Sequence, residues 1–184
     1  SDDIYHLLFR YRDDSNQCLY YANSETWTPE CVHECTLPEP GHFEIAASID
    51  TMENAEPIIA IDYETFNEQG DETANVFLYE KENSDWKGSV LYGPYDTNET
   101  FVDVFVKGDD LNLAFGEADK GTYYIHRYLF PQQGDVFHEK WWRQTITYLQ
   151  GLLVEQSGRQ HILYYLDNVN SQGDASGLYH AVCP

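Results

Sequence analysis

Aromatic side chains that could stack on a ligand recur at similar places along the sequence. Single or paired tryptophans follow three stretches rich in Tyr or Phe, at Trp27, at Trp86, and at Trp141 and Trp142. Flat rings of this kind stack on sugars, and Tyr adds a hydroxyl group to a rigid frame. Packing between repeats uses the same side chains and is the competing interpretation. The predicted ligand-binding residues are Trp27, Trp86, Trp141, Trp142, Tyr63, Tyr124, Tyr165 and Arg10.

No catalytic constellation is recognisable in the sequence, which contains no nucleophile elbow, phosphate-binding loop or His-Glu-x-x-His zinc motif. Carboxylates alternate at Asp62 and Glu64 and at Glu117 and Asp119, which places each pair on one face of a strand. In so acidic a chain we interpret such pairs as solvated faces rather than as a general acid and base. The sequence therefore predicts no catalytic residue, and a binding protein rather than an enzyme.

The candidate metal ligands do not form a recognised set. The segment DNVNSQGD, 167–174, resembles a calcium loop in composition but lacks its spacing and its closing Glu. His6 and His161 hold equivalent positions in the repeat described below, which we interpret as a structural position rather than a pair of ligands. No metal site is predicted, and calcium at 167–174 is the one cofactor that this composition leaves open.

The chain is strongly acidic, with 32 Asp and Glu against 10 Lys and Arg among 184 residues and a formal net charge of -22. This charge repels phosphate backbones and anionic lipids, so nucleic acid and membrane surfaces are not expected partners. No apolar run approaches the ~20 residues that span a bilayer. A glycan or a basic protein is the kind of partner that the composition favours.

Four cysteines fit two disulfide bonds in a secreted protein. The candidates are Cys18, Cys31, Cys35 and Cys183. Sequence alone does not choose among the three pairings. A bond from Cys183 to Cys18 or Cys35 would require the first and last repeats to be neighbours.

Zinc is the alternative use of these cysteines. CVHEC, 31–35, with His33 or His42 offers thiolates and an imidazole, but its spacing fits a zinc site poorly. A glycosylation sequon at Asn98 and a start without Met add to the expectation of a mature, secreted glycoprotein.

Four strands with similar sequences recur at regular intervals. They begin HLLFRYRD at His6, PIIAIDYE at Pro57, DLNLAFGE at Asp110 and HILYYLDN at His161. Successive starts are therefore 51, 53 and 51 residues apart. Each strand is followed by a turn rich in Gly, Asp, Asn or Ser and by a second aromatic strand, which is the pattern of a β-hairpin. A fixed period of this length is typical of a repeat architecture.

Each repeat is predicted to contain four antiparallel strands in about 52 residues, because one strand precedes the hairpin and another follows the Trp. The count gives fourteen strands, since the first repeat lacks its innermost strand and the last lacks its outermost. We predict an all-β, β-propeller-like array in a single domain, 1–184, with units near 4–50, 51–107, 108–156 and 157–184. Such a ring would close within one chain, in a homodimer, or with a companion chain.

The segment 136–156 is the one place where a helix competes, because its apolar residues lie near helical spacing. A helix there would favour a lipocalin-like barrel with one C-terminal helix. Thr145, Thr147 and Gly151 weaken a helix, so we predict two strands.

The repeat resembles that of the secreted fungal fucose-binding propeller lectins. The resemblance rests on FEIAASID (43–50), PIIAIDYE (57–64), NVFLYEKE (75–82) and DWKG (85–88), and at the level of pattern it covers most of the chain. In that family, each sugar site combines an Arg on one strand, a Glu on the next strand and a Trp beyond it. Here HLLFRYRD offers Arg10 or Arg12, whereas PIIAIDYE contains no Arg. The resemblance implies a lectin-like fold without fixing the sugar.

We therefore expect a secreted, non-catalytic protein that binds carbohydrate through aromatic clefts between repeats. The first alternative is a secreted protein-binding module, inhibitor or effector that uses its acidic surface. The second is a glycoside hydrolase or lyase.

Overall fold

The computed structural model describes residues 3–12, 16–36, 45–52, 56–66, 72–95, 102–108, 110–117, 121–128, 137–142, 148–155, 157, 159–166 and 177–183. These residues form fourteen β-strands and no helix. The strands are β1 (His6–Arg12), β2 (Asn16–Asn23), β3 (Glu30–Thr36), β4 (Ile45–Thr51), β5 (Pro57–Phe66), β6 (Glu72–Glu82), β7 (Asp85–Tyr95), β8 (Val102–Lys107), β9 (Asp110–Glu117), β10 (Gly121–Tyr128), β11 (Phe137–Trp142), β12 (Tyr148–Val154), β13 (Gln160–Leu166) and β14 (Gly177–Cys183).

The strands are arranged in four antiparallel sheets of three, four, four and three strands. We call β1–β3 the first sheet, β4–β7 the second, β8–β11 the third and β12–β14 the fourth. Within each sheet the strands pair in chain order, as in a meander. The all-β class and the antiparallel sheets are confirmed. The described part of 136–156 consists of β11 and β12, so the alternative of a helix there is wrong.

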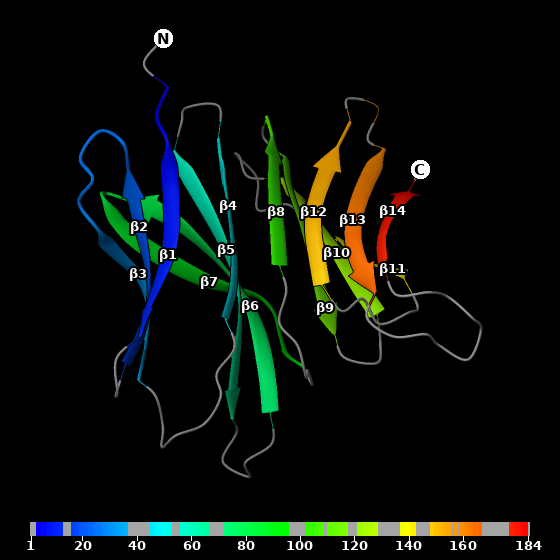
Figure 1. Ribbon diagram of the computed structural model, residues 1–184, viewed down its shortest axis with the longest axis horizontal. Coiled ribbons are helices and arrows are strands. Elements are labelled where there is room, and N and C mark those ends of the chain that lie inside the picture. Colours follow the sequence, from blue (N-terminus) through cyan, green and yellow to red (C-terminus); the bar gives the residue numbers. More distant parts are fainter. Residues whose placement is uncertain are drawn as a thin grey trace.

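The four sheets pack in a row in chain order, and along the long axis the first and second sheets lie toward one end and the third and fourth toward the other (Figure 1). The two chain termini lie on these opposite ends as well. The described residues form no closed ring, so the propeller arrangement stays a prediction.

Packing between neighbouring sheets explains why the second strand of each inner sheet is so apolar. On β5, Ile58 and Ala60 belong to a core shared with the third sheet, while Ile59 and Ile61 belong to a core shared with the first. All four are fully buried. A strand covered on both faces has a continuous apolar sequence rather than an alternating one.

Burial on both faces also corrects the interpretation of one carboxylate pair. Asp62 and Glu64 follow Ala60 on the β5 face that turns toward the third sheet, and their exposed fractions are 0% and 4%. The Tyr95 hydroxyl donates a hydrogen bond to Asp62 Oδ1 at 2.5 Å. The prediction of a solvated face is therefore wrong for this pair, because the neighbouring sheet covers it. The side chains of Glu117 and Asp119 lie outside the described residues.

Side chains of β4 satisfy the edge of the neighbouring sheet. In the third sheet β8 is an edge strand, and such edges normally leave amide groups without a ladder partner. The Val104 amide donates to Ser48 Oγ at 3.2 Å, and the Val106 amide donates to Asp50 Oδ2 at 2.7 Å. Lys107 Nζ in turn donates to the Glu155 carbonyl oxygen, directly after β12, at 2.6 Å. Polar contacts at the first strand of each sheet thus connect the second, third and fourth sheets.

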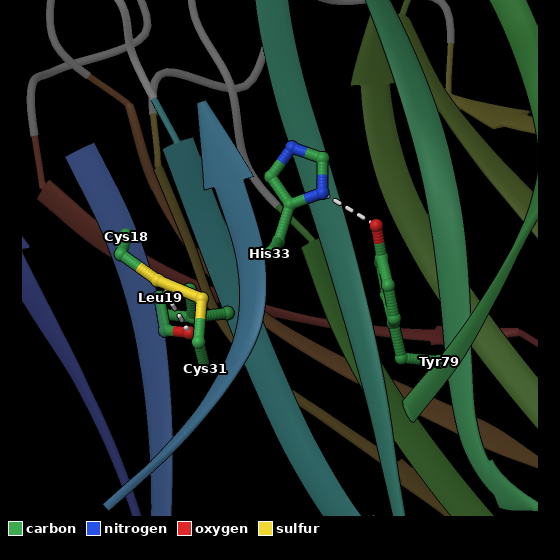
Figure 2. The surroundings of a disulfide bond; sticks show 5 residues. All are labelled: Cys18, Leu19, Cys31, His33 and Tyr79. Carbon is green, nitrogen blue, oxygen red and sulfur yellow. Dashed lines mark hydrogen bonds between the residues drawn. A yellow bond between two sulfur atoms is a disulfide. The ribbon is translucent and has the colours of Figure 1, made fainter. Parts of the chain in front are cut away.

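A disulfide bond joins Cys18 on β2 to Cys31 on β3, with Cα atoms 6.5 Å apart (Figure 2). Of the pairings that the sequence leaves open, this bond excludes the one between Cys183 and Cys18. The strand that carries Cys183, β14, lies at the opposite end of the molecule from the first sheet (Figure 1). The zinc alternative also fails, because an oxidised Cys31 offers no thiolate. The side chains of Cys35 and Cys183 lie outside the described residues.

Candidate functional site

A hydrogen-bonded turn after β2 presents Trp27 at the surface. Asn23 Oδ1 accepts hydrogen bonds from the amides of Glu25 and Thr26 at 3.1 and 3.2 Å. The Trp27 amide donates to the Asn23 carbonyl oxygen at 2.9 Å. Trp27 then adopts a φ of 53°, which is uncommon for a bulky residue. Its side chain is 61% exposed, so the turn, residues 23–28, holds a large apolar ring in water.

Tyr5 is the second exposed aromatic residue at this end of the first sheet. Its amide donates to Ser24 Oγ at 3.0 Å, and its carbonyl oxygen accepts from the Ser24 amide at 2.9 Å. These bonds join the segment before β1 to the turn that carries Trp27. The Tyr5 side chain is 68% exposed. Two exposed rings therefore come from adjoining segments.

A cluster of charged and aromatic side chains connects the first sheet to the second nearby. We call Tyr21, Glu30, Lys81 and Trp86 the Trp86 cluster. Trp86 Nε1 donates to Glu30 Oε2 at 3.1 Å, and Lys81 Nζ lies 2.6 Å from the same oxygen. Lys81 Nζ also lies 5.1 Å from the ring centroids of both Tyr21 and Trp86. The two rings meet edge to face at 5.2 Å, which is a favourable aromatic geometry.

His6 connects the Trp86 cluster to the Trp27 turn. His6 Nδ1 and the Tyr21 hydroxyl share a hydrogen bond at 2.8 Å. Burial lowers the pKa of His6, and the opposing charge effect of Glu25 on the turn is smaller. The imidazole is therefore held toward its neutral form, in which one nitrogen donates and the other accepts.

This end of the first sheet combines exposed rings with hydrogen-bonding groups of both kinds. Trp27 and Tyr5 offer flat apolar surface, and Glu25 offers an exposed carboxylate. Trp86 is different, because its ring packs on Tyr21 beneath Lys81 and its N–H is already used. Trp86 thus acts mainly in packing between sheets, which was the competing interpretation of the tryptophans.

The other predicted ligand-binding residues are not brought to this place by any described contact. Tyr63 is buried on β5, and Arg10 is exposed on β1. Trp141 and Trp142 on β11, Tyr124 on β10 and Tyr165 on β13 have side chains outside the described residues, as does Asn98 together with the segment 167–174.

A half-buried histidine lies between the first and second sheets, and sequence analysis considered it only as a zinc ligand. His33 Nδ1 shares a hydrogen bond of 2.5 Å with the Tyr79 hydroxyl (Figure 2). The rings of Tyr63 and Phe77 lie 4.9 and 5.6 Å from the imidazole. His33 Nε2 is buried without a hydrogen-bond partner, and burial lowers the pKa of the side chain. His33 is therefore a neutral member of an aromatic layer.

Gly88 makes the His33 contact geometrically feasible. It lies opposite Tyr79 in the pairing of β6 with β7. A Cβ atom at Gly88 would approach the Tyr79 ring to 2.5 Å. The absence of a side chain lets the ring lie flat over β7 and places its hydroxyl near His33. Residue spacing in the sequence does not reveal the pairing of His33 with Tyr79, because the two residues belong to different strands.

A second chain of polar side chains lies on the fourth sheet. His161 Nε2 is 2.7 Å from Glu155 Oε1, and His161 Nδ1 is 2.9 Å from His180 Nε2. The hydrogen bond to His161, followed by that from Ser157, lowers the pKa of Glu155. His161 was predicted to hold a structural position, and here it links two neighbours in a row. The three groups do not converge on a common point.

Within the described ranges, no group of three or more His, Cys, Asp or Glu side chains is placed to hold a metal ion. The described residues also contain no helix that is long and apolar enough to cross a membrane.

No protein-family model matches the chain, and no curated protein matches it. The disulfide bond in a small all-β protein is compatible with secretion.

Proposed function

We propose that the protein is a secreted, non-catalytic carbohydrate-binding protein and that the sugar stacks on Trp27 and Tyr5. The observation that carries this proposal is the exposed Trp27 ring on a turn closed by hydrogen bonds to Asn23. An indole in water is costly, and a ring that is already held in position loses little entropy when a ligand stacks on it. Both properties suit a binding surface.

The polar surroundings favour a neutral or amino sugar. Glu25 and Glu30 can accept hydrogen bonds from sugar hydroxyl groups, and Lys81 and His6 can donate them. A formal net charge of -22 disfavours anionic saccharides by repulsion. The ligand class that fits is thus a glycan without carboxylate or sulfate groups.

We further propose that the four sheets are blades of a propeller-type array. The grouping into three, four, four and three strands supports this, as do the polar contacts that connect β4, β8 and the end of β12. The strands β4, β8 and β12 would then lie nearest the axis, as in the predicted repeat, in which the first unit lacks this innermost strand.

Trp27→Ala tests the proposed site. We expect the affinity for a glycan identified on an array of neutral and amino sugars to fall by roughly 10-fold or more, because truncation of an aromatic anchor at a binding surface commonly costs about 2 kcal/mol or more. Trp27→Phe should retain part of the affinity. Val90→Ala, at another exposed apolar residue, serves as the control and should change nothing. Absence of binding across the whole array would refute the proposal.

Salt distinguishes the sugar from a basic protein partner, which the net charge of -22 also favours. Binding of a neutral sugar should hardly depend on ionic strength, whereas binding of a basic protein should weaken steeply as salt is added. A glycoside hydrolase gains no support from Asp62 and Glu64, which lie in the core and away from solvent.

A further inference from the structure

Exposed large hydrophobic side chains collect on the two end sheets of the row. Nine such side chains are exposed among the described residues, and only Val90 lies on an inner sheet. The first sheet and its adjoining turns carry Tyr5, Leu7, Tyr11 and Trp27, and the fourth sheet carries Leu153, Leu163, Leu178 and Val182. Clusters of exposed apolar side chains commonly mark surfaces that another molecule covers.

A triplet of side chains on the outer face of the first sheet recurs on two other strands, where a neighbouring sheet buries it. Each triplet has two apolar residues and then an aromatic one at alternate positions of a strand: Leu7, Phe9 and Tyr11 on β1; Ile59, Ile61 and Tyr63 on β5; Leu111, Leu113 and Phe115 on β9. The β5 triplet packs against the first sheet and the β9 triplet against the second, and none of these six residues is more than 9% exposed.

Among the described residues, no sheet covers the β1 triplet. Leu7 is 48% exposed and Tyr11 is 57% exposed. Phe9 stacks on Tyr20 of β2 at 5.6 Å on the same face but covers only part of it. The packing that buries its counterparts on β5 and β9 is therefore missing at β1 within the described ranges.

The fourth sheet also has an exposed apolar face, at the other end of the row of sheets. The strand register places Leu153, His161 and Val182 side by side, and Leu163 beside His180 in the next row of the same face. Leu153, Leu163 and Val182 are 52%, 39% and 49% exposed. In each inner sheet, the corresponding face is covered by the sheet that follows in the chain.

We propose that a second copy of this chain packs the outer face of its fourth sheet against the outer face of the first sheet, head to tail. The contact would repeat the packing of the first sheet on the second and of the second on the third. One chain does not bring its own two faces together, because they lie at opposite ends of the row (Figure 1). A head-to-tail contact of this type either closes into a ring or continues as a chain of copies.

Charge gives this contact a distinctive salt dependence. Two copies of net charge -22 repel each other, and added salt screens that repulsion. Self-association should therefore strengthen with salt, which is the reverse of the behaviour of an acidic protein that binds a basic partner.

Sedimentation of the full chain at micromolar concentrations, in low and in moderate salt, tests the proposal. We expect species of at least twice the chain mass, favoured by salt. Tyr11→Asp in the first sheet and Leu178→Asp in the fourth should each weaken association by ~100-fold, because each buries a charge without a partner. Val90→Asp is the control and should leave the mass unchanged. Circular dichroism of each variant checks that it folds.

An equimolar mixture of the two variants gives the sharpest outcome. One intact first-sheet face and one intact fourth-sheet face then meet between unlike copies, so a dimer should reappear. A wild-type chain that stays monomeric at both salt concentrations would overturn the proposal and point to another cover for these faces. A dimer that only one of the two variants disrupts would overturn it as well, since it would join like faces.

Discussion

His33 shows how a single side chain can make the stability of the protein depend on pH. Its imidazole is held neutral by burial among aromatic rings, so its pKa in the folded state lies below its ordinary value of 6.5. Between these two values the unfolded chain binds more protons than the folded chain, and the free energy of unfolding must fall as the pH falls. The stabilisation is complete above 6.5 and is lost on acidification toward the folded-state pKa.

Replacement of His33 by Phe should reduce that dependence. We expect urea titrations between about pH 7.5 and about pH 5.5 to give a smaller loss of stability than in the wild type, because the proton linkage is removed. Part of the slope should persist, because burial lowers the pKa of His6 too. His180→Gln, at an exposed position, is the matched control. An unchanged slope in His33→Phe would contradict the assignment.

At the level of elements, the side chains of β4 replace the strand that β8 lacks on one side. We expect Asp50→Ala to lower the free energy of unfolding by about 1–3 kcal/mol, because the Val106 amide loses its acceptor in a partly buried place. Chemical denaturation measures this change. Glu34→Ala, on the exposed side of β3, removes the same charge and should cost much less. Equal effects of the two substitutions would show that the edge contact contributes little.

The order of the strands was predictable because apolar and aromatic residues recur with a fixed period along the sequence. The predicted starts at His6, Pro57 and Asp110 coincide with β1, β5 and β9, and the start at His161 falls one residue inside β13. The burial of Asp62 was not predictable in the same way, since polarity normally marks the solvent side of a strand. Only the position of the strand within the stack decides that both of its faces are covered.

The candidate site was predicted in part. Trp27 was identified from its place after an aromatic strand, but its exposure depends on the turn that Asn23 organises. His33 and Tyr79 are 46 residues apart in sequence and lie on different sheets, so no local sequence pattern predicts their contact. Side chains that meet across sheets are therefore the part of the site that one sequence does not reveal.

For the whole molecule, charge opposes compactness. We expect the urea midpoint to rise when salt is added at low ionic strength, because screening relieves repulsion within a chain of net charge -22. Measurement in Tyr11→Asp separates this effect from self-association. Sodium and potassium chloride should act alike if screening is the cause. A falling midpoint would mean that ion pairs such as Lys81 with Glu30 outweigh the repulsion.

The bond between Cys18 and Cys31 closes a covalent loop around the segment that carries Trp27, with a sequence separation of 13 residues. Closure of a loop this short removes a large part of its conformational freedom when the surrounding strands loosen. Reduction of the bond would leave the turn held by its hydrogen bonds and by the packing of β2 and β3 on the second sheet. A reductant should therefore loosen the loop that presents Trp27, and the affinity of the surface proposed to bind sugar should fall with it.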